Sequence, residues 1–196
     1  MKVIKEKYHD LVQFVTDEYI SSLVNKSKGL YVLGYSKDPV FDFIPFKTIL
    51  SYLEYGSFLK NKPKINKDIY IYKKDESEKL TRIEYWGDNE KLSWMELFDY
   101  DNDLSITIDS YSELLFISKL YKKNDILTDS MLISIDDISI HYHYIYNNGK
   151  ITEIDSFSFD ENNEFYSKIR LNVIYSEDGK TNIYYLNGSE KIFMIE

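Results

Sequence analysis

The stretch 139-SIHYHYIYNNGKITEI-154 decides the fold class, because it holds two alternating segments on either side of a turn signal. In its first half, alternation places Tyr142, Tyr144 and Tyr146 on one face of a β-strand and two histidines on the other. The Asn-Gly pair that follows favours the positive φ values of a two-residue hairpin turn. The stretch therefore predicts two antiparallel strands joined by a tight turn.

The same period of two recurs over most of the chain beyond residue 68. It is clearest in residues 92–100, 104–108 and 165–175. Polar clusters separate these segments, among them KDESEK, GDNE, DYDND, KKNDILTDS, DENNE, SEDGK and LNGSE. Because no helical pattern intervenes, we expect neighbouring strands to pair as hairpins. Residues 68–196 are predicted to form a meander of about ten strands.

Residues 1–67 have a different pattern. Apolar residues at steps of three and four predict an amphipathic helix over residues 2–25, and Gly29 is a stop signal after it. A second, short helix is expected within residues 45–56. The fold class is therefore predicted as α+β, with the N-terminal helix and the short second helix packed on a large, mostly antiparallel β-meander. We interpret residues 1–196 as a single domain with a helix-containing, net basic head.

Two segments of the predicted meander show weak sequence similarity to each other. The segment KLTRIEY at 79–85 matches KITEIDS at 150–156. Either residues 70–146 and 142–196 are copies of one duplicated unit, or alternating strands with polar turns produce the match by themselves.

The composition is that of a globular protein, with 43% hydrophobic and 29% charged residues and a net charge of −9. Residues 1–67 carry 11 lysines against 7 acids, a balance of +4, whereas residues 68–196 carry 13 basic against 26 acidic residues, a balance of −13. Phosphate binding needs clustered lysine and arginine, so we expect no nucleic acid partner. A basic protein partner is the better electrostatic match.

No run approaches the roughly 18 apolar residues that cross a bilayer, and the first residues lack the apolar core of a signal peptide. We therefore expect a cytoplasmic protein without a membrane partner. Cysteine is absent, which excludes disulfides, thiolate metal sites and cysteine nucleophiles. Lysine outnumbers arginine 22 to 2, which indicates an AT-rich genome.

Two segments imitate metal sites. His141 and His143 share a strand face, but a zinc site needs a third ligand and the only other histidine is His9. The segment DYDNDLSITIDS begins like a calcium loop, yet Leu104 stands where glycine is required and Ser110 where glutamate is required. We favour strand histidines and an acidic hairpin loop and predict no metal, while a metal-dependent enzyme that uses the histidine pair stays an alternative.

Enzyme motifs are missing from the sequence. The chain has no G-x-S-x-G elbow and no G-x-x-x-x-G-K or G-x-G-x-x-G loop. We predict no catalytic residues, no cofactor and no enzymatic activity.

Aromatic residues accumulate in the acidic part of the chain. The predicted helices cover about one sheet face, so the other face must meet solvent, a partner or itself. Tyrosine suits a wet binding face, and tyrosine and tryptophan dominate binding hot spots, whereas the competing interpretation is that the rings fill the core. On the binding interpretation, the partner-binding residues are four aromatic hot spots and three acids that steer association: Tyr142, Tyr144, Tyr146, Trp94, Asp99, Asp101 and Asp103.

An acidic, cysteine-free chain of this size, rich in tyrosine and asparagine, with a leading helix and turns such as YNNGK and SEDGK, resembles the immunity proteins that low-GC bacteria pair with secreted or contact-delivered toxins. The resemblance implies a non-catalytic inhibitor that occludes a toxin or enzyme with a complementary surface. A small phage-encoded inhibitor of a host enzyme would have the same features. The alternative is a small-molecule or saccharide binder, with or without hydrolysis, that uses the aromatic face as a cup.

Overall fold

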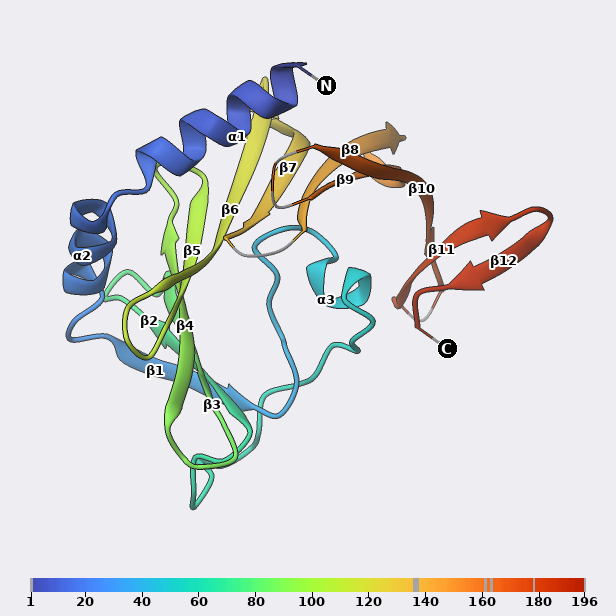
Figure 1. Cartoon of the computed structure of the whole chain (residues 1–196). Coiled ribbons are helices and arrows are strands. Elements are labelled where there is room, and N and C mark those ends of the chain that lie inside the picture. Colours follow the sequence, from blue (N-terminus) through green and yellow to red (C-terminus); the bar gives the residue numbers. More distant parts are fainter. Residues whose placement is uncertain (1, 136–137, 161, 163, 178, 196) are drawn as a thin grey trace. The chain divides into compact units, whose positions relative to one another are not determined.

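The computed structural model describes residues 2–135, 138–160, 162, 164–177 and 179–195. Within these ranges the predicted α+β class is confirmed, because three helices accompany a twelve-stranded sheet in which each strand pairs with the next one in sequence (Figure 1). The helices are α1 (Lys2–Phe14), α2 (Asp17–Lys26) and α3 (Lys47–Leu50). The strands are β1 (Tyr31–Ser36), β2 (Ile69–Lys74), β3 (Leu80–Trp86), β4 (Leu92–Asp99), β5 (Leu104–Asp109), β6 (Leu114–Lys123), β7 (Ile126–Ser134), β8 (Ser139–Asn147), β9 (Lys150–Phe159), β10 (Phe165–Tyr175), β11 (Thr181–Asn187) and β12 (Glu190–Phe193). No helix among the described residues is long and apolar enough to cross a membrane.

The chain forms two compact units. The first unit consists of Met1–Phe41 and Tyr55–Ser118, and the second of Asp42–Glu54 and Lys119–Glu196. The expected head, which ends at residue 67, is divided between the units, because Asp42–Glu54 belongs to the second unit and the rest of the head to the first. The chain passes to the second unit again within β6. The interpretation as one domain stays a prediction.

The N-terminal region forms two helices where one was predicted. Helix α1 ends at Phe14, and Thr16 caps α2: its backbone is extended, with φ −88° and ψ 167°, and its Oγ1 accepts a hydrogen bond from Tyr19 N at 3.2 Å. Asp17 and Glu18 follow in the first turn, where negative charge is favourable. The apolar periodicity predicted the helical residues but not the cap that divides them.

In the first unit, α2 and its C-cap residue pack on one sheet face through contacts with β3 and β4. Tyr19 Oη donates to Asp99 Oδ2 at 2.6 Å, and Arg82 Nη1 donates to Ser27 Oγ at 3.2 Å. The aliphatic side chains buried on this sheet face are Ile69, Ile71, Leu97, Leu104, Ile106 and Ile108. Burial contributes about 2 kcal/mol for each such side chain, so this face is the main core of the first unit.

Loop residues cover part of the opposite face of the same strands. Val40 N donates to Tyr72 Oη at 3.0 Å, and the ring of Phe58 packs edge-on against Tyr72 with centroids 5.2 Å apart. Gly34 in β1 permits this packing, because a Cβ atom there would lie 2.5 Å from the Phe58 ring. Tyr72 is consequently 1% exposed.

In the second unit, one face of β8 to β10 is part of the core. Tyr144, Ile154 and Leu171 are direct neighbours across these strands, and all three are buried. The β8–β9 hairpin turns at Asn148 and Gly149, with φ values of 49° and 75°. The predicted two-residue hairpin turn is thus confirmed.

The segment KKNDILTDS, predicted to be a turn region, is mostly strand. Only Asn124 and Asp125 turn, with φ values of 51° and 61°, and β7 begins at Ile126. A two-residue turn of this kind needs no further polar residues, so the threonine, aspartate and serine that follow belong to β7. Their side chains alternate between the faces, and Ser130 is buried beside Tyr144 whereas Asp129 faces His143.

Candidate functional site

The three predicted tyrosines of β8 do not form an open face. Tyr142 and Tyr144 are 6% and 3% exposed, whereas Tyr146 is 37% exposed and donates to Leu127 O at 2.8 Å. Tyr144 Oη and Ser130 Oγ lie 2.6 Å apart inside the core, and burial raises the pKa of both Tyr142 and Tyr144. The expectation of an exposed tyrosine row is therefore wrong for Tyr142 and Tyr144. Alternation placed them correctly on one face, but the second unit buries that face.

Of the three predicted steering acids, Asp99 is bound within the β4–β5 turn. Its carboxylate accepts hydrogen bonds from Tyr19 Oη at 2.6 Å, Asn102 Nδ2 at 2.8 Å and Asp101 N at 3.2 Å. Partial burial opposes ionisation of Asp99, but these hydrogen bonds outweigh it and lower the pKa. Asp101 is exposed at the turn, and Asp103 is half-buried with a φ of 47°. Asp101 is thus the best placed of the three to steer a partner, and that role stays a prediction.

Trp94 belongs to a group of three aromatic rings in the first unit. The register of β2, β3 and β4 makes Tyr70, Tyr85 and Trp94 successive cross-strand neighbours. The rings of Tyr85 and Trp94 stack with centroids 5.6 Å apart and an interplanar angle of 24°, and the Tyr70 ring lies 5.0 Å from Tyr85 and 5.9 Å from Trp94. All three side chains are half-buried, so part of each remains in contact with solvent. We call these three residues the aromatic cluster.

Two carboxylates lie directly beside the aromatic cluster. Asp109 on β5 is the cross-strand neighbour of Trp94. Asp68, which precedes β2, has its Oδ1 3.5 Å from Tyr85 Oη. One acidic residue is therefore next to Trp94 in the register, and another approaches the hydroxyl of Tyr85.

Two further carboxylates act on the cluster electrostatically. Burial raises the pKa of Tyr70 to about 12, with smaller contributions from Tyr72, Tyr85 and, last, Asp38. Burial, Asp68 and Asp88 together raise the pKa of Tyr85. We define the acidic rim as Asp38, Asp68, Asp88 and Asp109. None of the four forms an ion pair with another residue that the structure describes.

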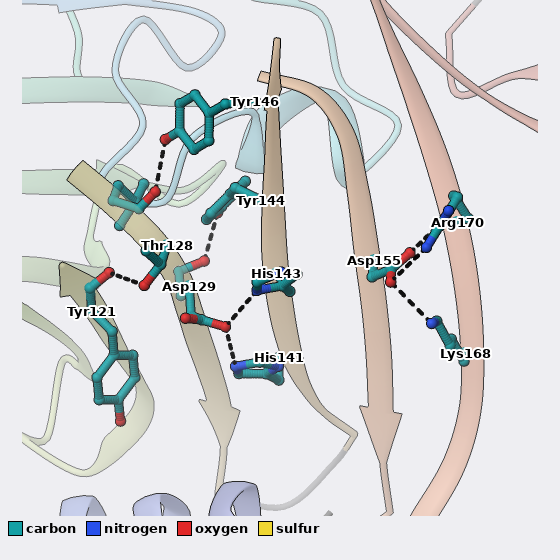
Figure 2. Close-up of polar contacts among 12 residues, drawn as sticks. Tyr121, Thr128, Asp129, His141, His143, Tyr144, Tyr146, Asp155, Lys168 and Arg170 are labelled. Atoms are coloured by element: carbon teal, nitrogen blue, oxygen red, sulfur yellow. Dashed lines mark hydrogen bonds and ion pairs between the residues drawn. The ribbon is translucent and has the colours of Figure 1, made fainter. Parts of the chain in front are cut away.

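The second unit brings both strand histidines to one carboxylate (Figure 2). Asp129 on β7 is the cross-strand neighbour of His143, and its Oδ1 lies 3.0 Å from His143 Nδ1 and 3.2 Å from His141 Nε2. Burial of Asp129 opposes its ionisation, but His141, Thr128 and His143 outweigh burial and hold the pKa well below its usual range. His141 is 5% exposed, and neither ring nitrogen makes a hydrogen bond to a described residue, because its approach to Asp129 does not have hydrogen-bond geometry.

This arrangement differs from a metal site. The carboxylate of Asp129 lies between the two imidazoles and contacts both (Figure 2). Among the residues that the structure describes, no group of three histidine, aspartate or glutamate side chains could hold a metal ion. We therefore interpret His141 and His143 as strand residues that one carboxylate orients.

A second ion cluster lies beside the first on the same sheet face. Asp155 on β9 is the cross-strand neighbour of both His143 and Arg170. Its carboxylate accepts from Arg170 Nε at 2.7 Å and Nη2 at 3.0 Å, and it lies 2.9 Å from Lys168 Nζ (Figure 2). Hydrogen bonds from Arg170 outweigh burial and, with Lys168, lower the pKa of Asp155 to about 2. We call Asp129, His143, Asp155 and Arg170 the charged row.

Comparison of the chain with protein families, with curated proteins and with solved structures gives no match. The class that the fold defines is an α+β protein built on a meander sheet, and its candidate sites are those that the residues themselves form.

Sequence reasoning named Trp94 but missed the residues around it. Tyr70 and Tyr85 look like any other alternating tyrosines, and only the register of β2 to β4 brings them to Trp94. The sequence likewise does not single out the rim residue Asp109, because only the register of β4 and β5 places it next to Trp94.

One feature of the sequence, its two arginines, indicates residues of the charged row. The chain has two arginines among 24 basic residues, and each lies 2.7 Å from a carboxylate oxygen: Arg82 from Glu84 and Arg170 from Asp155. Arginine offers a rigid donor fork that lysine lacks, so its presence in a lysine-rich chain indicates a paired carboxylate.

Proposed function

We propose that this chain is a non-catalytic binding protein of the immunity type, which neutralises a basic toxin or enzyme by docking on it and occluding it. The observation that supports this most is the aromatic cluster with its acidic rim in the first unit. The proposal moves the docking surface from the β8 tyrosines to Tyr70, Tyr85 and Trp94.

The acidic rim carries negative charge that could attract a basic partner. Each rim carboxylate lacks an ion-pair partner in the described chain, so the rim attracts a positively charged surface before contact. The net charge of −9 acts in the same direction. Complementary charge of this kind raises the association rate more than it slows dissociation.

The three rings of the aromatic cluster supply contact area for a partner. Half-buried tyrosine and tryptophan lose further apolar area when a partner covers them, while their polar atoms stay able to bond. The three rings already hold one another through contacts of 5.0 to 5.9 Å, so little side-chain entropy is lost on binding. Pre-ordered aromatic groups of this kind are typical hot spots.

Parallel affinity capture tests the proposal. Three tagged proteins are compared on lysate of the source organism: the wild type, a rim variant with Asp88→Asn and Asp109→Asn, and a control variant with Asp75→Asn and Asp160→Asn. The control is matched, because Asp75, Asp109 and Asp160 each accept two backbone N–H groups in a hairpin turn through Oδ1, which asparagine retains.

We expect the wild type and the control to retain a basic protein that is toxic or enzymatically active when free and inactive in the complex. The rim variant should bind it about fivefold more slowly, and added salt should remove that difference. A captured protein that stays active in the complex, or that binds the rim variant and the control at equal rates, would overturn the proposal.

A further inference from the structure

The two sides of the Trp94 indole have different neighbours. Tyr85 stacks on it from β3, with Tyr70 beyond on β2. On the β5 side its cross-strand neighbour is Asp109. No aromatic ring or cation among the described residues contacts Trp94 from that side.

The carboxylate of Asp109 is held in place by the turn after β5. Its Oδ1 accepts hydrogen bonds from Tyr111 N at 2.7 Å and Glu113 N at 2.9 Å. These bonds hold the carboxylate at the start of the turn, on the strand next to Trp94, and no cation among the described residues pairs with it. An indole face attracts an organic cation, and an unpaired carboxylate on the neighbouring strand adds to that attraction.

Elsewhere the chain supplies such cations itself. Among the residues that the structure describes, these lysines lie over aromatic rings at 4.1 to 5.9 Å from the ring centroid: Lys79, Lys119, Lys150, Lys168 and Lys191. Their rings belong to tyrosine or phenylalanine, whereas tryptophan has the most favourable face for a cation. Trp94 is thus a stronger site than those the chain fills, and it has a carboxylate in addition.

We propose that the β5 side of Trp94, together with Asp109, binds a lysine or arginine side chain of the partner. The cation would lie against the indole and pair with the carboxylate of Asp109. This inference rests on the proposed function, and it specifies which group of the basic partner enters the aromatic cluster.

Nuclear magnetic resonance of the two indole N–H groups tests the site directly, because Trp86 and Trp94 are the only tryptophans. Trp86 Nε1 donates to Glu84 Oε2 at 3.1 Å, and Glu84 is 5% exposed, so Trp86 is an internal control. The probes are tetralysine amide and tetraarginine amide, with tetraserine amide as the uncharged control. We expect both basic peptides to shift the Trp94 signal to saturation and to leave the Trp86 signal in place.

Single variants locate the cation. Asp109→Asn keeps the acceptor for both turn amides and removes the charge, so it should weaken peptide binding about threefold, whereas the matched Asp75→Asn should leave it unchanged. A larger shift with one basic peptide would identify lysine or arginine as the better ligand. Equal weakening by both variants, or a Trp94 signal that moves no more than that of Trp86, would overturn the site.

The two proposals fail in distinguishable ways. If a basic partner is captured in a rim-dependent manner but the peptides do not shift Trp94, the cation site is wrong and the docking function stands. If the peptides shift Trp94 but capture shows no rim dependence, the site stands and the docking function is wrong.

Discussion

The aromatic cluster of the first unit and the charged row of the second unit are both rows of cross-strand neighbours. They differ in whether the nearby acids have ion-pair partners. In the charged row, Asp155 binds Arg170 and Lys168, and Asp129 lies between two imidazoles. Beside the aromatic cluster, four carboxylates have no ion-pair partner among the described residues. The two acids of the charged row therefore stabilise the sheet of the second unit through ion pairs, whereas the four acids of the rim have no such partner among the described residues.

This difference indicates where a charged partner would bind. Docking on the charged row would require breaking ion pairs that already exist, which costs desolvation without new charge pairing. Docking on the acidic rim brings positive charge to carboxylates that have no ion-pair partner among the described residues. Acidity alone is thus a poor guide to a docking surface, and unpaired acidity is a better one.

The largest expected effect separates buried from half-buried rings. Tyr144→Ala should lower the free energy of unfolding by about 4 kcal/mol, because it leaves a cavity in the core and an unpaired Ser130 hydroxyl. Tyr85→Ala should cost only about 1 to 2 kcal/mol, since its ring is half-buried. Urea unfolding followed by circular dichroism measures both. Equal losses would show that the aromatic cluster is simply core.

The next effect concerns partner binding by two exposed or half-exposed rings. Trp94→Ala should weaken the complex by about 2 kcal/mol, roughly 30-fold, as expected of a hot spot. Tyr146→Ala removes the most exposed of the β8 tyrosines and should leave affinity within about twofold of the wild type. Calorimetry with the captured partner measures both affinities. A larger loss of affinity with Tyr146→Ala than with Trp94→Ala would show that the docking surface is on β8.

A third effect is the acid dependence of the charged row. The pKa of Asp155 is about 2 in the folded chain, against about 3.9 when unfolded, so its stabilisation is complete above about pH 5 and is lost as the pH falls towards 2. Because Arg170 is 55% exposed, we expect a contribution of about 1 kcal/mol. Urea midpoints at pH 6 and pH 2.5 should therefore differ less for Asp155→Asn than for the wild type. An unchanged difference would mean that Asp155 is not held in its ionised form by Arg170.

The alternating pattern predicts which side chains share a sheet face. It does not predict which face is buried, because burial depends on tertiary contacts. The patterns IYIY in β2 and HYIY in β8 look alike, yet Tyr70 is half-buried in the aromatic cluster and Tyr144 is 3% exposed. The hairpin turn at Asn148 was predictable because its φ requirement is local. The partners Asp129 and Asp109 were not, because strand register is set by the whole sheet.

The smallest effect distinguishes the acids of the β4–β5 turn. Asp99→Asn should cost about 1 kcal/mol of stability, because the charge-assisted bond from Tyr19 becomes a neutral one. Asp101→Asn should leave stability unchanged and slow partner association by less than about twofold. Thermal unfolding and association kinetics on the two variants measure these effects. Equal stability would mean that Asp99 does not anchor helix α2.

The docking surface itself is tested most directly by hydroxyl-radical footprinting of the captured complex, read residue by residue by mass spectrometry. We predict that the partner protects Trp94 and Tyr85 from oxidation, while Tyr111 and Tyr166, which are 85% and 70% exposed in the free chain, stay reactive. Protection of Tyr146 or Tyr166 with Trp94 oxidised at its free rate would contradict the account.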